Sequence, residues 1–197
     1  MSTLAQLHRR RAHVSWDVIS PCQRYRYRAV RVWDSSLPTL GVVGHRIVTG
    51  GLRRCDTDLR RISVFARAWG YGGVDLGHLY GLAAANFEVA GSRIDQIGAD
   101  NDTHLAAVCQ DNDLTVLAWG HDADPARAHE VAELLWRVTA GHGGSLAVLG
   151  WDESGQPCTA QEVPRATTPE CLTLSATSHG LHEAEDPRWM HLLAGAA

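Results

Sequence analysis

Short apolar runs alternate along this chain with longer segments in which apolar residues recur every three or four positions. Because side chains repeat with a period of two in a strand and 3.6 in a helix, this alternation indicates buried strands and amphipathic helices. Strands are predicted at 39–43, 74–80, 114–120 and 145–150. Helices are predicted at 57–69, 100–110 and 124–140. Such an order favours right-handed crossovers, so we expect an α/β fold, a three-layer α/β/α sandwich around a central, mostly parallel four-stranded sheet.

The two ends of the chain differ from this central part. Residues 24–33 alternate between polar and apolar side chains, which is typical of a strand with one wet face and one buried face, so we expect an N-terminal edge strand there. After Pro164 there is little periodicity until a short helix predicted at 187–193. We divide the chain into an N-terminal extension (1–23), an α/β domain (24–164) and an irregular C-terminal appendage (165–197).

The charge balance narrows the range of ligands. All 18 basic residues are arginine, so the chain has neither a Schiff-base lysine nor a phosphate-loop lysine. A net charge of -4 lacks the basic excess with which duplex-DNA binders displace counterions. We therefore expect a small nucleoside or nucleotide as the partner, with single-stranded nucleic acid as a further possibility.

Cysteine usage and the apolar pattern point to the cytoplasm. Five cysteines are odd in number and never form a Cys-x-x-Cys pair, so neither a disulfide framework nor a zinc site is predicted. His179-Gly180-Leu181-His182-Glu183 departs from the His-Glu-x-x-His spacing of zinc enzymes. We expect no metal and no cofactor. No run of about 18 apolar residues occurs, so we expect no membrane partner and a cytoplasmic location.

Polar and aromatic side chains follow the predicted strands, where the ligand crevice of an open parallel sheet lies. The candidate substrate-binding residues there are Gly44, Arg46, His78, Tyr80, Trp119 and Gly120. His45 is the candidate acid/base or nucleophile, because an imidazole exchanges protons near neutral pH. Asp152 or Glu153 could complete an acid/base set, although a surface turn is the better explanation of these residues.

Several of these residues have a second interpretation. The loop predicted at 44–51 could cradle an anion with its backbone amides, or could be a flexible glycine turn. His45 and His78, taken singly, could be polar residues satisfied within the fold. Core packing is the first explanation of Trp119, although at a cavity rim it could stack on a base.

Several short motifs occur in a fixed order between Arg24 and Pro164. They are Asp56 with Leu59-Arg60-Arg61, Phe65-Ala66-Arg67-Ala68-Trp69-Gly70-Tyr71-Gly72-Gly73, Asn101-Asp102, Ala118-Trp119-Gly120, Leu149-Gly150 and Gly155-Gln156-Pro157. In this order they resemble an uncharacterised bacterial family, a domain of unknown function in the uracil-DNA glycosylase-like superfamily. The Trp-Gly-Tyr-Gly-Gly string is the most specific of them. Asp56, within the first motif, joins the candidate catalytic residues.

The resemblance implies a three-layer fold with four parallel strands and assigns two roles. It makes His78 the counterpart of a strand-end asparagine that reads a base edge, and the 44–51 loop the counterpart of a water-positioning motif. The family usually carries Asn-Pro-Ser in that loop and His-Pro after the last strand. This chain has Gly44-His45-Arg46 and Cys158-Thr159-Ala160 instead, so the motifs for ordinary uracil excision are not intact.

We therefore expect a glycosidase-like hydrolase or transferase acting on a nucleoside, nucleotide or modified base. The base would lie near His78 and Trp119, and Arg46 would steady a phosphate. Two alternatives stay open. One is a non-catalytic nucleobase-binding or nucleotide-binding protein, and the other is an oligomeric interaction module, such as a homodimer formed through residues 24–33 or the tail at Trp189.

Overall fold

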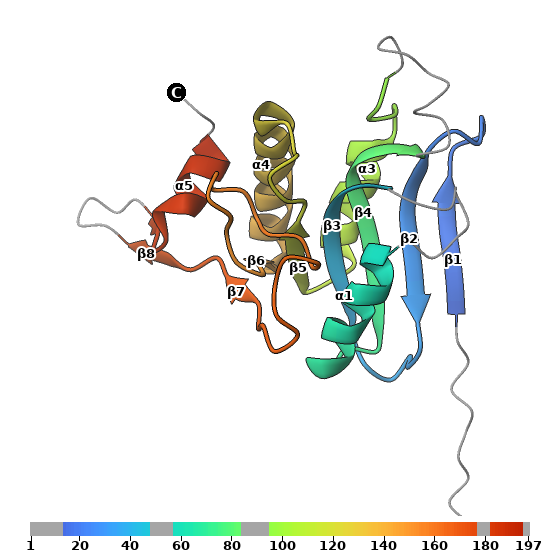
Figure 1. Cartoon of the computed structure of the whole chain (residues 1–197), viewed down its shortest axis with the longest axis horizontal. Coiled ribbons are helices and arrows are strands. Elements are labelled where there is room, and N and C mark those ends of the chain that lie inside the picture. The colour runs from blue at the N-terminus through green and yellow to red at the C-terminus, as the bar shows by residue number, and fades with distance from the viewer. Residues whose placement is uncertain (1–13, 48–56, 84–94, 177–181, 195–197) are drawn as a thin grey trace, which may run out of the picture.

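The computed structural model describes residues 14–47, 57–83, 95–176 and 182–194, in which strands and helices alternate (Figure 1). The strands are β1 (Val14–Ile19), β2 (Arg26–Val32), β3 (Thr39–Ile47), β4 (Gly73–Ala83), β5 (Leu114–Ala118), β6 (Ser145–Val148), β7 (Glu170–Cys171), β8 (Leu174–Ala176) and β9 (His182–Ala184). The helices are α1 (Thr57–Ala68), α3 (Asn101–Gln110), α4 (Pro125–His142) and α5 (Pro187–Ala194). The mixed α/β class predicted from the alternation is confirmed.

The main sheet has seven strands in the order β1-β2-β4-β3-β5-β6-β7, so it is wider than the predicted four-stranded sheet. Parallel pairing joins β3 to β4, β3 to β5 and β5 to β6, whereas β1, β2 and β7 pair antiparallel with their neighbours. Parallel pairs need long crossovers, and α1, α3 and α4 lie in those connections. β8 and β9 form a separate antiparallel hairpin.

The strand predicted at 24–33 is not an edge strand, because β1 pairs along its outer side. Its side chains are accordingly more buried than an edge strand with one wet face would allow. Arg26 is 1% exposed and Arg28 is 8% exposed. Residues 14–19, which we assigned to an N-terminal extension, thus form the outermost strand of the sheet.

Two apolar layers lie on opposite faces of the sheet. Successive residues of a strand point to opposite faces, so Val42 packs with Leu59 and Phe65 of α1 whereas Val43 packs with Leu135 of α4. Figure 1 shows α1 on the near face of the sheet and α3 on the far face. The described helices therefore cover both faces.

β3 and β4 run beyond their predicted ends. We predicted a loop from Gly44 onward, but β3 continues to Ile47. The side chain of Ile47 is fully buried, so extending the strand removes an apolar group from water. The register shifts after Arg46, which pairs with Tyr80, because Ile47 then pairs with Ala83. β4 thus carries extra residues at this point.

Residues after 164, which we assigned to an appendage, contribute to the sheet and to the core. β7 pairs with β6, and α5 packs onto the layer that contains α4. Trp189 of α5 is 2% exposed and meets the ring of Trp151 edge-on, with centroids 5.1 Å apart. The C-terminal helix is therefore held by burial of a large aromatic side chain.

A buried ion pair connects β2 to β4. Arg28 donates from Nε to Asp75 Oδ1 at 2.7 Å, and its Nη2 contacts both Asp75 and Asp111. Asn112 donates from Nδ2 to Asp75 Oδ2 at 3.1 Å. Both carboxylate oxygens of Asp75 are thus partnered, which is what allows a charge to stay in the interior.

Replacement of Asp75 by alanine is expected to lower the free energy of unfolding by about 3–5 kcal/mol, because the Arg28 charge then keeps, among the described residues, only the largely exposed Asp111 as a carboxylate partner. Urea denaturation measures this. Glu133→Ala is the control, since Glu133 pairs with Arg137 on the surface of α4 and its loss should cost less than about 1 kcal/mol. An equally small cost for Asp75→Ala would contradict the role assigned to the buried pair.

Candidate functional site

The carboxyl ends of β3 and β4 bring two predicted site residues into contact. His45 lies on β3 and Tyr80 on β4, and their rings meet edge-to-face with centroids 5.5 Å apart and an interplanar angle of 74°. Both side chains are partly buried. Arg46 pairs in register with Tyr80 and is exposed, so a cationic group follows His45 at the rim of the sheet.

The surroundings of His45 favour a neutral imidazole. Burial lowers the pKa of His45 and the adjacent charge of Arg46 lowers it further, while Asp122 raises it and His121 lowers it. These last two residues lie in the turn after β5, so that turn is close enough to act on His45. Burial also raises the pKa of Tyr80, which keeps its phenol protonated. A neutral imidazole can accept a proton and a phenol can donate one, so the pair suits acid/base chemistry.

His78 lies deeper than a strand-end position would place it. It is 1% exposed and pairs in register with Gly44 inside the sheet. A Cβ atom on Gly44 would lie 3.3 Å from Cδ2 of His78, so the glycine makes room for the ring. His78 therefore offers a ligand almost no surface in this conformation, and its role as a base reader stays a prediction.

Trp119 and Gly120 join the end of β5 to the loop that follows β6. Trp119 is 1% exposed within the α4 layer, and its Nε1 donates to Gln156 Oε1 at 2.9 Å. Gly120 has a φ of 77°, which favours glycine, and its N–H donates to the carbonyl of Pro157 at 2.8 Å. The burial of Trp119 fits the core-packing interpretation better than base stacking.

Asp152 holds the loop after β6. Its Oδ1 accepts hydrogen bonds from the N–H of Ser154 at 2.8 Å, from the Ser154 hydroxyl at 2.6 Å and from the N–H of Gln156 at 2.9 Å. These bonds make an Asx turn, which Gly155 completes with a φ of 78°. They fit the surface-turn interpretation of Asp152. Asp56, the third candidate catalytic residue, lies outside the described residues.

A cavity of about 500 Å³ opens beyond the carboxyl ends of β5 and β6, between α4, α5 and the loop that Asp152 holds. Its volume lies within the range of about 300–1,000 Å³ that is usual for small-molecule sites. The polar residues that line it are His121, His129, Ser154, Gln156, Arg188 and His191. Imidazole, guanidinium and amide groups around one cavity suit a ligand with negative charge or hydrogen-bond acceptors.

Two of the lining histidines have defined partners. His121 is flanked by carboxylates, with Nε2 3.2 Å from Asp122 Oδ1 and Nδ1 3.5 Å from Glu162 Oε1. His129 Nδ1 lies 3.0 Å from the carbonyl oxygen of Leu192. Because a carbonyl only accepts, Nδ1 of His129 carries a proton, and Nε2 is the ring nitrogen left for a ligand.

The strand-end positions led to Trp119 and Gly120, which directly precede His121, but not to His129, Arg188 and His191. His129 lies just over one turn inside α4, so the Asp124-Pro125 helix start was a usable signal for it. Arg188 and His191 lie on α5. Arg188 and His191 line the cavity because α5 packs against α4. The periodicity of a short helix does not predict which other helix it will pack against.

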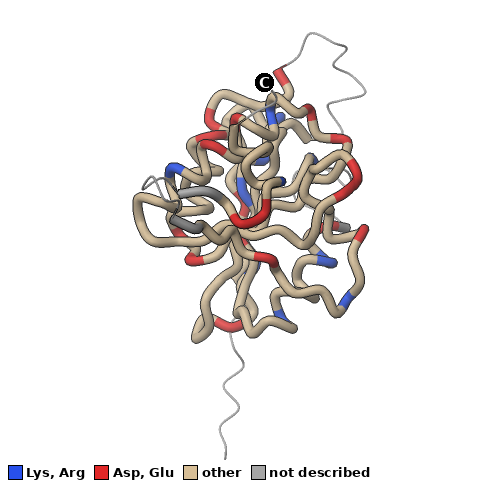
Figure 2. The backbone as a smooth tube through the Cα atoms, turned by 90° about the vertical axis from the view of Figure 1, so that its left-hand side faces the viewer, with Lys and Arg blue, Asp and Glu red and all other residues tan. Residues whose placement is uncertain are grey.

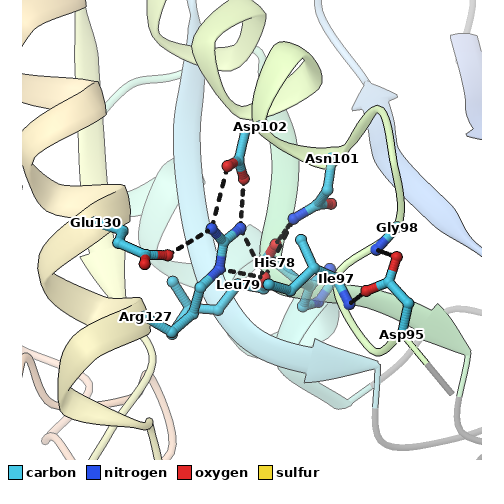
Figure 3. Close-up of polar contacts among 9 residues, drawn as sticks. All are labelled: His78, Leu79, Asp95, Ile97, Gly98, Asn101, Asp102, Arg127 and Glu130. Carbon is cyan, nitrogen blue, oxygen red and sulfur yellow. Dashed lines mark hydrogen bonds and ion pairs between the residues drawn. The ribbon is translucent and has the colours of Figure 1, made fainter. Parts of the chain in front are cut away.

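Side chains of α3 and α4 bind the end of β4 beside this region, as Figure 3 shows. Arg127 is 5% exposed, donates from Nε and Nη2 to the Leu79 carbonyl at 3.2 Å, and forms an ion pair with Asp102. Asn101 is fully buried and donates from Nδ2 to the carbonyls of His78 at 3.0 Å and Leu79 at 3.2 Å. These bonds fix the first turns of both helices against the strand that carries Tyr80.

Other kinds of site have less support in the described part of the chain. There, no group of three or more His, Cys, Asp or Glu side chains could hold a metal ion, and residues 179–181 of the histidine motif lie outside it. In Figure 2 the arginine positions are scattered among acidic ones. None of the described helices has the length and apolar content needed to cross a bilayer.

A known protein family matches the part of the chain that forms most of the sheet. Residues 26–158 match a family described as "Protein of unknown function (DUF1643)". No curated protein and no solved structure matches the chain. The matched segment contains β2 to β6 together with His45, Trp119 and Gln156. Because it spans more than half of the 197 residues, the chain belongs to the DUF1643 family, as the resemblance to a domain of unknown function led us to expect.

Proposed function

We propose that this protein is a glycosidase-like hydrolase or transferase that acts on a nucleoside, a nucleotide or a modified base. The cavity at the ends of β5 and β6 carries the proposal, because it combines a volume of about 500 Å³ with imidazole, guanidinium and amide groups. Such groups bind phosphates and the edges of bases. His121 lines the cavity and also acts electrostatically on His45, so the acid/base pair and the cavity share a neighbour.

The topology supports membership of the uracil-DNA glycosylase-like superfamily, which the resemblance implies. Parallel pairing joins β4, β3, β5 and β6 in that order, with helices on both faces. The connection that leaves β3 leads to β4 on one side of β3, whereas β5 and β6 lie on the other side of β3. In open α/β sheets ligands bind at such a switch point. His45 and His121 lie at the ends of the two strands that flank it.

His45 is the proposed general base. In the hydrolytic reaction its neutral imidazole takes a proton from water, the water oxygen bonds to the sugar C1′, and the C1′–N bond breaks. The base leaves with the bonding electron pair and receives the proton that His45 held. Arg46 is exposed next to His45 and would bind a phosphate of the substrate.

A non-catalytic nucleobase-binding or nucleotide-binding protein is the second candidate. The bonding of Asp152 favours it, because three hydrogen bonds engage Oδ1 of this carboxylate in a turn. The altered first motif, Gly44-His45-Arg46, points the same way. Homodimerisation, a single-stranded nucleic acid ligand and a cytoplasmic location stay predictions.

Wild-type protein is expected to release free base from one or more members of a panel of nucleosides, nucleotides and single-stranded oligonucleotides, as measured by liquid chromatography. Release should fall at least about 100-fold in His45→Ala, because general acid–base catalysis contributes typically 10²–10⁴-fold. His142→Ala is the matched control. His142 is exposed in the last turn of α4, whereas Pro125, at the other end of this helix, lines the cavity. Loss of the His142 side chain should therefore leave the rate of base release unchanged.

Two other results would decide against catalysis. Thermal stabilisation by a nucleotide, with no base released from any substrate, would favour the non-catalytic candidate. The absence of both turnover and stabilisation across the whole panel would overturn both candidates.

The pH dependence of base release tests the environment of His45. Burial and Arg46 lower the pKa of His45 below its ordinary 6.5, so the imidazole stays neutral until the pH falls below that value. The ratio kcat/KM is therefore expected to be constant from about pH 8 to about 6.5 and to fall only in more acidic buffer. A rate that already declines on acidification above pH 6.5 would argue that a different group is the base.

A further inference from the structure

The amide of Gln156 has its orientation fixed by a neighbour. Gln156 lines the cavity, and its Oε1 lies 2.9 Å from the indole Nε1 of Trp119. An indole N–H only donates, so the amide atom that meets it has to be the oxygen. The amide nitrogen, with its two N–H donors, is therefore the part of Gln156 that is left for a ligand.

The structure around Gln156 resists a turn of this amide. Trp119 is 1% exposed inside the α4 layer, where close packing prevents the indole from swinging aside. The Gln156 backbone is held by Asp152, whose Oδ1 accepts its N–H at 2.9 Å and whose N–H donates to its carbonyl at 2.9 Å. A turned amide would set its N–H groups against the indole N–H and leave that buried donor without an acceptor.

We infer that Gln156 is a specificity-determining residue, which selects ligands that present a hydrogen-bond acceptor, such as a carbonyl oxygen, over matched ligands that present an amino group. The carbonyl gains a hydrogen bond from the amide N–H, whereas an amino group would set donor against donor and lose its hydration. Trp119 is a positioning residue, because it acts on the ligand through Gln156. The inference rests on the proposed function, since it requires a nucleotide in the cavity.

The test uses ligands in which a carbonyl next to a ring N–H replaces an amino group next to an unprotonated ring nitrogen. The pairs are inosine 5′-monophosphate with adenosine 5′-monophosphate, and uridine 5′-monophosphate with cytidine 5′-monophosphate. Calorimetric dissociation constants for the full-length protein are expected to favour the carbonyl-bearing member of at least one pair by about tenfold, the size of one hydrogen bond gained or lost. Equal binding within both pairs, or a preference for the amino-bearing members, would overturn the inference.

Two variants separate reading of the ligand from general damage. Gln156→Glu keeps the shape of the side chain but replaces the donor by an acceptor, so the preference should reverse towards the amino-bearing member. Trp119→Phe keeps most of the aromatic volume and removes the N–H, which frees the amide to turn. The preference should then fall below about threefold. A merely structural role for Trp119 would weaken both members of a pair equally and leave their ratio unchanged.

Matched controls lie at the opposite end of the sheet. Trp33→Phe also removes an indole hydrogen bond, the one to the Tyr71 carbonyl at 3.0 Å, but beside the start of β4. Gln110→Glu adds the same charge as Gln156→Glu, at the exposed last residue of α3. Both controls should keep the wild-type preference.

The outcomes distinguish this inference from the proposed function. Nucleotide binding with the same preference in wild type, Gln156→Glu and Trp119→Phe would overturn the inference and leave the proposed function standing. Failure of all four ligands to bind wild-type protein would overturn the inference together with nucleotide recognition. If circular dichroism shows that Trp119→Phe does not fold, Gln156→Ala replaces it and is expected to bind both members of each pair equally.

Discussion

The indole of Trp119 connects the core of this fold to the wall of its cavity. Its ring is buried in the layer between the sheet and α4, while its N–H reaches Gln156 in the loop after β6. The next residue, Gly120, takes a left-handed conformation and donates to Pro157. The end of β5 is therefore bonded to the following loop by a side chain and by the backbone. Displacing that loop would break the hydrogen bond between Trp119 and Gln156 and leave the buried indole N–H without an acceptor. The loop that lines the cavity is therefore held in place by the core.

The other side of the carboxyl edge is fixed by a different device. Arg127 and Asn101, at the starts of α4 and α3, both donate to the carbonyl of Leu79 on β4. This occurs close to where the register between β3 and β4 shifts and Tyr80 meets His45. Side-chain donors here support backbone carbonyls where the strand pairing becomes irregular. The strand that carries Tyr80 is thus held by a buried cation in a helix that also borders the cavity.

The alternation of apolar runs with helical segments was enough to predict the α/β class and most element positions, because each of those signals is local. It did not predict that β1 would pair outside residues 24–33, since partner choice between strands is a long-range property. The end of β3 was also misjudged, because burial of Ile47 follows from its neighbours in β4. The strand-end rule led to His45 and to Gly120, which directly precedes His121, but Arg188 reaches the cavity only through packing of the C-terminal helix.

Two concavities lie at opposite ends of the sheet, and their charges differ. The one near the starts of β3 and β5 has a volume of about 380 Å³ and is lined by Asp111 and Asp113 with hydroxyl, amide and apolar groups, and its lining includes no cationic residue. A phosphate there would lie close to two carboxylates, and the repulsion between like charges at short range is unfavourable. The cavity beyond β5 and β6 contains three histidines and Arg188, whose guanidinium pairs with Asp186. Topology therefore favours the end of the sheet with the imidazole and guanidinium groups, which the other concavity lacks.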